Sequence, residues 1–185
     1  MSCHRFYGNG VERRKWQNPD SILAAIGLNL GFTFVDVGCG DGFFSIPAAK
    51  IVGKMGRVFA LDSDEEAIAS LRKKAFTKNL MNIEARVGTA EDTVLCDACA
   101  DVVFLGIVLH DFKDPARVLA NAMKMLKPKG RLVDLDWKKE SMDFGPPLSI
   151  RFSEEIAIGL IEGAGFKVGQ QKDAGRFHYL IIARR

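Results

Sequence analysis

The sequence lacks the segments that mark secreted, membrane-spanning or fibrous proteins. No stretch is both long enough and free enough of charge to span a bilayer, and residues 1–7 include no apolar signal segment. No internal repeat or low-complexity tract occurs, which excludes solenoid and fibrous folds. With 185 residues and a hydrophobic fraction of 48%, the chain suits one globular domain, and we expect it in the cytoplasm.

Cysteine is scarce, with four residues and no regular spacing. A reducing cytoplasm keeps such residues as thiols, so we expect no disulfide. Cys96 and Cys99 have the spacing of half a zinc site, and Cys3 with His4 could supply the other half. A single C-x-x-C motif is weak evidence for a metal, and we predict no metal site.

A large excess of charge of either sign is also missing. Lysine and arginine number 26 against 23 acidic residues, and the basic side chains are scattered along the chain. This balance gives little support to nucleic-acid binding, although it does not exclude a polyanionic partner. The sequence indicates no particular oligomeric state.

Strand-like and helix-like segments alternate along the chain. Asp114-Pro115 and Ser153 are typical helix starts. The alternation predicts a parallel, doubly wound α/β sheet, because crossover helices must cover both of its faces, and the last two strands are expected to be antiparallel. The predicted strands are 32–37, 57–62, 83–87, 101–106, 131–137, 166–171 and 177–183, and the predicted helices include 43–52, 115–127 and 153–163.

A glycine-rich turn, Gly38-Cys39-Gly40-Asp41-Gly42, follows the first predicted strand. Glycines allow the backbone to turn sharply and to approach a ligand closely, and the N-terminus of the following helix attracts an anionic group. A nicotinamide or flavin fingerprint would need glycine where Phe43 stands. The turn therefore predicts a ligand site and argues against a dinucleotide.

Three further positions lie at predicted strand ends, where ligands bind in open α/β sheets. Asp62 ends the second strand, where a carboxylate can accept both hydroxyls of a ribose. Residues 88–92 follow the third strand, where a base on that ribose would reach. His110 follows the fourth strand and is either a catalytic base or substrate ligand, or a residue that caps the entry to the next helix.

These motifs, in this order, resemble those of class I S-adenosylmethionine-dependent methyltransferases. The branch that the chain resembles contains ubiquinone and menaquinone biosynthesis methyltransferases. The resemblance implies a Rossmann-like seven-stranded sheet of order 3-2-1-4-5-7-6 with strand 7 antiparallel. It is carried by residues 35–42, Asp62, 88–92, 108–115 and 126–132.

The resemblance also implies S-adenosylmethionine as the cofactor. Asp36 would approach the ammonium of its methionine part, and Ala90 would offer its amide to adenine. Many relatives have Asp where this chain has Thr89, so Glu91 or Asp92 would supply the contact to the adenine amino group. The cofactor-binding residues that the resemblance implies are Asp36, Gly38, Gly40, Asp62, Ser63, Thr89, Ala90, Glu91 and Gly106.

The expected reaction is in-line methyl transfer to an unidentified small molecule, without a metal. A base is needed only where the acceptor loses a proton, and His110 is the first candidate and Asp136 the second. Trp137 and Lys138 either border the acceptor pocket or belong to the core and the solvated surface. The alternatives are an RNA or protein methyltransferase and a catalytically silent cofactor-binding subunit.

Two segments are expected to select the acceptor, because residues 20–185 form a single methyltransferase domain with no inserted one. They are loop 138–152 and an N-terminal arm, residues 1–19, which is alternatively a loosely packed terminus. The arm carries Phe6, Tyr7, Arg13, Arg14 and Trp16.

Overall fold

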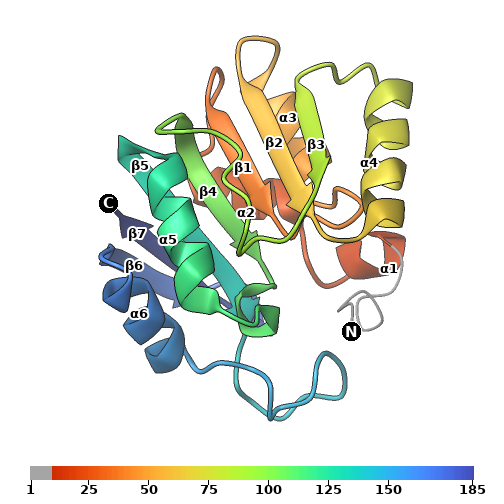
Figure 1. The fold of residues 1–185 in the computed structure, drawn as a ribbon. Helices are drawn as coiled ribbons and strands as arrows, with labels where there is room; N and C mark the ends of the chain where they lie inside the picture. The colour runs from red at the N-terminus through yellow and green to blue at the C-terminus, as the bar shows by residue number, and fades with distance from the viewer. Residues whose placement is uncertain (1–9) are drawn as a thin grey trace.

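A computed structural model describes residues 10–185, which form one seven-stranded sheet flanked by helices (Figure 1). The strand order is β3-β2-β1-β4-β5-β7-β6, and β7 alone runs antiparallel to both of its neighbours. The predicted α/β sheet, its order and its antiparallel seventh strand are therefore confirmed. The strands are β1 (Thr33–Val37), β2 (Arg57–Asp62), β3 (Ile83–Val87), β4 (Ala100–Gly106), β5 (Leu126–Trp137), β6 (Lys167–Asp173) and β7 (His178–Arg184).

Several helices begin at residues that cap them. The side chains of Asp64, Asp114 and Ser153 each accept a backbone N–H bond from the first helical turn. No helix within residues 10–185 is long and apolar enough to cross a membrane. The α-helices are α1 (Gly10–Arg14), α2 (Pro19–Ala25), α3 (Ser45–Val52), α4 (Glu65–Thr77), α5 (Pro115–Met125) and α6 (Glu154–Gly163), and η2 (Leu109–Asp111) is a 3₁₀ turn.

The sheet lies between two apolar layers (Figure 1). On one face, α5 and α6 pack against side chains such as Leu105 and Leu132. On the other face, α2 and α3 cover Phe34 and Val133, and α4 covers Ala60. The central strands are buried on both sides, so ligands have access only at the strand ends. Helix α1 and loop 138–152 both lie at the lower edge in Figure 1, near the carboxyl ends of the parallel strands.

The starts of two elements differ from the prediction by two residues or more, whereas the other predicted starts agree to within one residue. β5 begins at Leu126, directly after α5, and not at Arg131, because Leu126 is extended (φ −75°, ψ 136°) and pairs with Ala100. Pro128 favours the extended conformation in the residue before it, which continues the strand. α3 begins at Ser45, later than predicted, because residues 40–44 form turns.

The connection between β3 and β4, residues 88–99, has no helix and crosses the face that α5 covers. It ends in a disulfide between Cys96 and Cys99, whose Cα atoms lie 5.9 Å apart. The prediction that the chain has no disulfide is therefore wrong. The physical reason is local: Ala98 adopts a left-handed conformation (φ 44°), which folds the C-x-x-C segment back on itself.

Candidate functional site

The glycine turn after β1 presents backbone without side chains at the carboxyl edge of the sheet. Gly38, Gly40 and Gly42 all have positive φ, at 72°, 53° and 92°, a conformation that glycine adopts without strain. A Cβ atom on Gly38 would lie 2.7 Å from Val108 Cγ1, so a larger residue does not fit there. The Leu61 carbonyl accepts the Gly38 N–H at 2.8 Å and ties the turn to β2.

The Asp62 carboxylate closes the same turn from the end of β2. Its Oδ2 accepts the N–H of Gly40 at 2.7 Å, and its Oδ1 accepts the N–H of Asp64 at 3.0 Å. The structure thus brings together the glycine turn and the acidic residue that the sequence singled out. A carboxylate has about four lone-pair positions, so Asp62 can also accept O–H groups from a ligand beside the turn. Ser63 follows it and is exposed.

Asp36 lies beneath the turn and is 1% exposed. The Ser45 hydroxyl donates to its Oδ2 at 2.5 Å. Burial raises the pKa of the Asp36 carboxyl to about 7, and the bond from Ser45 and the charge of Arg13 oppose this rise. A cationic group placed here would favour the ionised form, so the geometry suits a ligand ammonium.

Helix α1 packs against the aromatic residues that directly follow the glycine turn. The Arg13 guanidinium lies 4.1 Å from the centre of the Phe43 ring, and its Nε donates to Gln17 Oε1 at 2.7 Å. Trp16 packs on Trp137, with 5.4 Å between ring centres. The predicted arm residues Phe6 and Tyr7 lie outside the described residues, whereas Arg14 forms an ion pair with Asp20 at 3.6 Å.

The loop after β3 is fastened to α5. The side-chain amide of Asn121 donates to the carbonyls of Ala90 and Glu91, at 3.1 Å and 2.8 Å. Glu91 Oε1 accepts the N–H of Lys113 at 3.1 Å. These bonds fix the backbone of the predicted adenine loop beside the start of α5.

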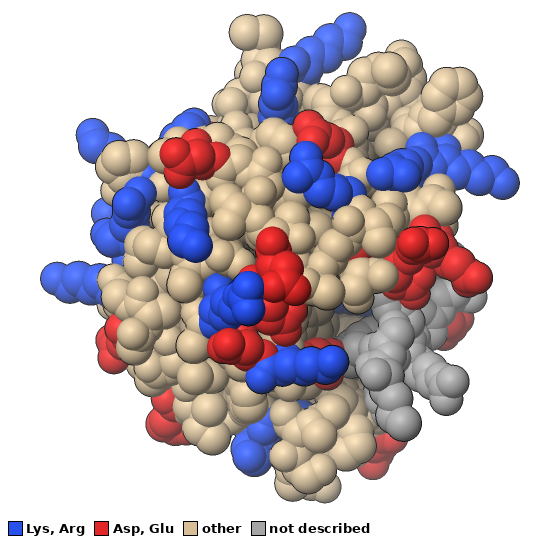
Figure 2. Space-filling model, in the orientation of Figure 1, with Lys and Arg blue, Asp and Glu red and all other residues tan. Residues whose placement is uncertain are grey.

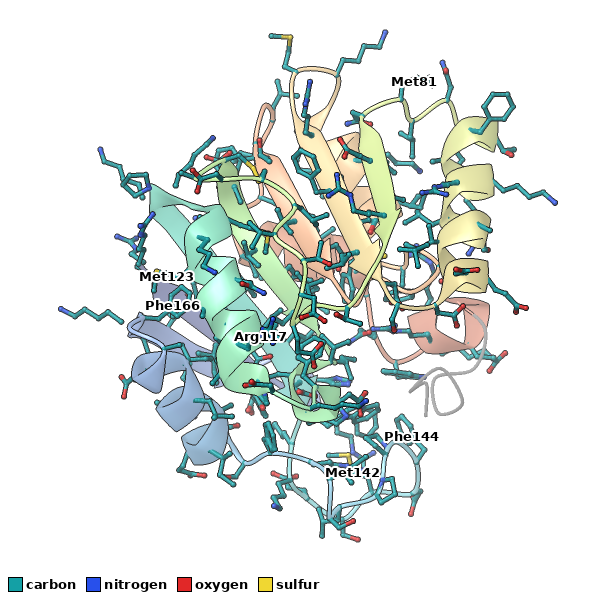
Figure 3. The ribbon with its side chains drawn as sticks, in the orientation of Figure 1. Met81, Arg117, Met123, Met142, Phe144 and Phe166 are labelled. Carbon is teal, nitrogen blue, oxygen red and sulfur yellow. A yellow bond between two sulfur atoms is a disulfide. The ribbon has the colours of Figure 1, made fainter. Side chains whose placement is uncertain are left out.

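Two neighbouring side chains in this loop bond to each other. The Thr89 hydroxyl donates to Asp92 Oδ2 at 2.8 Å, and Asp92 also pairs with Arg117 at 2.8 Å. Arg117 extends from α5 (Figure 3). The structure describes two side-chain partners for Asp92 and one hydrogen-bond partner each for the side chains of Thr89 and Glu91, so Thr89 and Glu91 are the better candidates for a ligand contact.

A histidine–carboxylate pair joins the ends of β4 and β5. The chain leaves β4 through Gly106 and the left-handed Ile107 (φ 66°), and η2 then points His110 toward β5. Its Nδ1 lies 2.8 Å and 2.9 Å from the two carboxylate oxygens of Asp136, and its Nε2 lies 3.4 Å from Asp111 Oδ1. The two predicted catalytic residues are thus in direct contact, in a buried position.

Asp134 and Tyr179 are buried polar residues that the sequence analysis missed. Asp134 is fully buried, and neither of its carboxylate oxygens has a hydrogen-bond partner among the described residues. Burial, reinforced by the nearby Asp136, raises the pKa of Asp134 well above its usual value, which favours the neutral acid. The one available signal was the alternation of acidic residues in an otherwise apolar strand, Asp134-Leu135-Asp136.

Loop 138–152 is fixed by one buried arginine. Arg151 is 3% exposed, and it donates to the carbonyls of Pro146, Glu140 and Phe144 at 2.8 Å, 3.0 Å and 3.2 Å. Figure 3 shows Met142 and Phe144 on this loop, at the edge of the sheet where the site lies.

Trp137 belongs to the core and does not line an open pocket. Its side chain is fully buried, because its place in β5 directs it to the face that carries α2 and α3. Lys138 is largely covered and pairs with Asp173 at 2.8 Å, so it is not a freely solvated side chain. Of the two alternatives for this segment, the core assignment of Trp137 is confirmed.

Metal ligands do not gather in the part of the chain that the structure describes. Residues 10–185 contain no cluster of three His, Cys, Asp or Glu side chains that could hold an ion. Cys3 and His4, the other half of the conceivable zinc site, lie outside these residues.

Comparison with known proteins reveals one family. The family model described as a methyltransferase domain matches residues 28–151. The crystal structure of a S-adenosylmethionine-dependent methyltransferase from Aquifex aeolicus is 33% identical, with a TM-score of 0.86 over 92% of this chain and 91% of that one. A S-adenosylmethionine-dependent methyltransferase from Mesorhizobium loti shares the fold at 17% identity, with a TM-score of 0.71 over 89% of this chain and 96% of that one.

Curated relatives are longer than this chain. The demethylmenaquinone methyltransferase of Listeria monocytogenes is 31% identical over 122 residues, which are 66% of this chain and 51% of that protein. An uncharacterised 37.1 kDa protein in transposon TN4556 of Streptomyces fradiae is 34% identical over 131 residues, 70% of this chain and 37% of that protein. The chain spans about half the length of the first relative and less of the second.

The stability of the fold should depend on the protonation of Asp36. Its pKa rises from 3.8 to about 7 on folding, so its stabilising contribution is complete below about pH 4 and is lost as the pH rises through 7. As the pH rises from about 4 to about 7, we expect the free energy of unfolding of the unliganded wild type, measured relative to that of an Asp36→Asn variant, to fall by up to roughly 4 kcal/mol. This corresponds to about 1.4 kcal/mol for each unit by which the pKa is shifted. Urea denaturation at a series of pH values measures this difference, and a difference that does not change with pH would contradict the assignment.

Proposed function

The chain belongs to the class I S-adenosylmethionine-dependent methyltransferases, related to the menaquinone branch, and on this basis we propose that it is an active enzyme that methylates a small molecule. The observation that carries the proposal is the contact between His110 and Asp136 at the same edge of the sheet as the glycine turn. A cofactor-binding site alone is equally consistent with a catalytically silent subunit that only binds the cofactor. A buried base beside it favours catalysis.

The residues at the carboxyl edge fit the cofactor that the family uses. When bound, S-adenosylmethionine supplies a methyl group already activated on a sulfonium. Gly38 and Gly40 would line its methionine part, the buried carboxyl of Asp36 would hold the ammonium, and Asp62 would accept the ribose hydroxyls. Ala90, whose carbonyl is fixed by Asn121, would offer its amide to the adenine, beside Ser63, Thr89, Glu91 and Gly106.

His110 is the proposed general base, and Asp136 orients it. With Nδ1 held against the Asp136 carboxylate, Nε2 is the nitrogen that can accept a proton from an acceptor hydroxyl or ammonium. Asp136 stabilises the imidazolium that forms, and the exposed Asp111 adds a second negative charge 3.4 Å from Nε2. Asp136 was the second candidate base, and its burial against His110 supports an orienting role.

A small acceptor fits the surface better than a nucleic acid does. On the face drawn in Figure 2, Lys and Arg side chains alternate with Asp and Glu and form no continuous basic area. Helix α1 and loop 138–152 would enclose the acceptor, with residues 1–19 as an arm on the domain formed by residues 20–185. A cytoplasmic location is part of this proposal, and the Cys96–Cys99 disulfide is an unusual feature for that compartment.

Cofactor binding should depend on the Asp62 carboxylate. A charge-assisted hydrogen bond contributes about 1.5–3 kcal/mol, so Asp62→Ala should weaken binding of S-adenosylhomocysteine by roughly 10- to 100-fold. Asp20→Ala, which removes the same charge from the exposed surface of α2, should bind as the wild type does. Calorimetric titration gives both affinities, with nicotinamide dinucleotide as the negative control. Equal binding of the two ligands, or of neither, would refute the cofactor assignment.

Methyl transfer should depend on His110. Incubation with methyl-labelled S-adenosylmethionine and fractionated cell extract should place the label in the small-molecule fraction. Loss of a general base costs roughly 10²–10⁴-fold in rate, so His110→Gln should abolish most of the labelling and leave the affinity for S-adenosylhomocysteine intact. Label in RNA or protein would support the alternative acceptors, and full labelling by His110→Gln would exclude this residue as the base.

A further inference from the structure

The Cys96–Cys99 disulfide is a reactive group that the proposed methyl transfer does not use. Both cysteines are only partly buried, and Asp97 and Ala98 between them are exposed. Both side chains also pack against the apolar layer beneath α5, so the partial exposure of the two residues is the access that an attacking thiol would use. The remaining cysteine of residues 10–185, Cys39, is a buried free thiol in the glycine turn, and burial raises its pKa well above the usual value, so it is a poor competitor for the same chemistry.

The disulfide is seated on the C-terminal end of α5. The N–H of Ala98 donates to the Lys124 carbonyl and the N–H of Cys99 donates to the Met125 carbonyl, both at 2.9 Å. The C-terminal end of a helix carries partial negative charge, which disfavours thiolates beside it. The position therefore favours the disulfide over the dithiol, and a strong reductant is needed to open it.

The same stretch of α5 holds the predicted adenine loop. Asn121 bonds the carbonyls of Ala90 and Glu91, and Met125 Sδ accepts the N–H of Leu95 at 3.4 Å. The segment from 90 to 99 is thus fastened to α5 at its start, near its middle and at its end. The disulfide links two residues of the segment itself, so it constrains the backbone at 96–99 that donates to the end of α5, and it does not tie the segment to the helix directly.

We propose that Cys96 and Cys99 form a thiol–disulfide exchange site for a dithiol reductant, and that the disulfide form holds the adenine loop ready to bind the cofactor. The coupling to the cofactor rests on the function proposed above, whereas the exchange chemistry does not. A thiolate of the reductant attacks one sulfur, the Cys96–Cys99 bond breaks, and a mixed disulfide forms. The second thiol of the reductant resolves it, so the reductant leaves as a disulfide and both cysteines gain a proton.

Reduction should leave the fold intact and loosen the loop. The disulfide closes a ring of only four residues, so it lowers the entropy of the unfolded chain only slightly. Reduction of the disulfide should therefore lower the unfolding temperature by only roughly 4–8 °C. The hydrogen bonds from Asn121 persist after reduction. The affinity for S-adenosylhomocysteine should therefore fall by roughly 3- to 10-fold and not vanish.

The experiment uses the full chain after treatment with either oxidised or reduced dithiothreitol. Intact mass should show the oxidised protein lighter by two hydrogen atoms, and titration should show tighter binding of S-adenosylhomocysteine in that form. The double variant Cys96→Ser/Cys99→Ser should bind as the reduced wild type does, without any response to dithiothreitol. The matched control Cys3→Ser should keep the full response.

Three results would overturn the inference, each in a recognisable way. Four free thiols after oxidation would exclude the exchange site. A mass change with equal affinity in both states would exclude the coupling to the loop. No binding of S-adenosylhomocysteine in either state would overturn the proposed function, and the coupling with it, while the mass change would still report the exchange.

Discussion

Parallel pairing of β1 with β2 on one side and with β4 on the other is the constraint on which the candidate site depends. The register places Val37 opposite both Leu61 and Leu105, so all three strands end at one edge. The glycine turn, the Asp62 carboxylate and the η2 turn lie at or just beyond the ends of these three strands. A shift of one residue in either pairing would turn the side chains of a whole strand to the opposite face and separate these groups.

The site gathers acidic side chains into a region of low exposure. Asp36, Asp134 and Asp136 are all buried at or near the carboxyl edge, and burial raises the pKa values of Asp36 and Asp134. Burying carboxyl groups costs stability unless they find partners. Here Asp136 has His110 and Asp36 has Ser45, and a cationic ligand would offset the remaining cost. The acidic edge thus matches a cofactor that carries both an ammonium and a sulfonium.

Sequence reasoning recovered the parts of the molecule that short-range signals determine. The caps at Asp114 and Ser153 and the glycine turn are local patterns, and the strand order followed from the resemblance to a family. The contact between His110 and Asp136 was out of reach, because 26 residues separate them and the left-handed Ile107 sets the direction of η2. The disulfide was missed for a different reason. The C-x-x-C spacing was visible, but an argument from the cellular compartment outweighed it.

The central claim is that the carboxyl edge binds S-adenosylmethionine with its reactive end toward His110. A crystal structure of the complex with S-adenosylhomocysteine tests it most directly. We predict that the ribose hydroxyls bond to Asp62, that the adenine lies against Ala90, and that the sulfur faces the η2 turn. A nucleoside bound elsewhere, or a sulfur directed away from His110, would contradict the account.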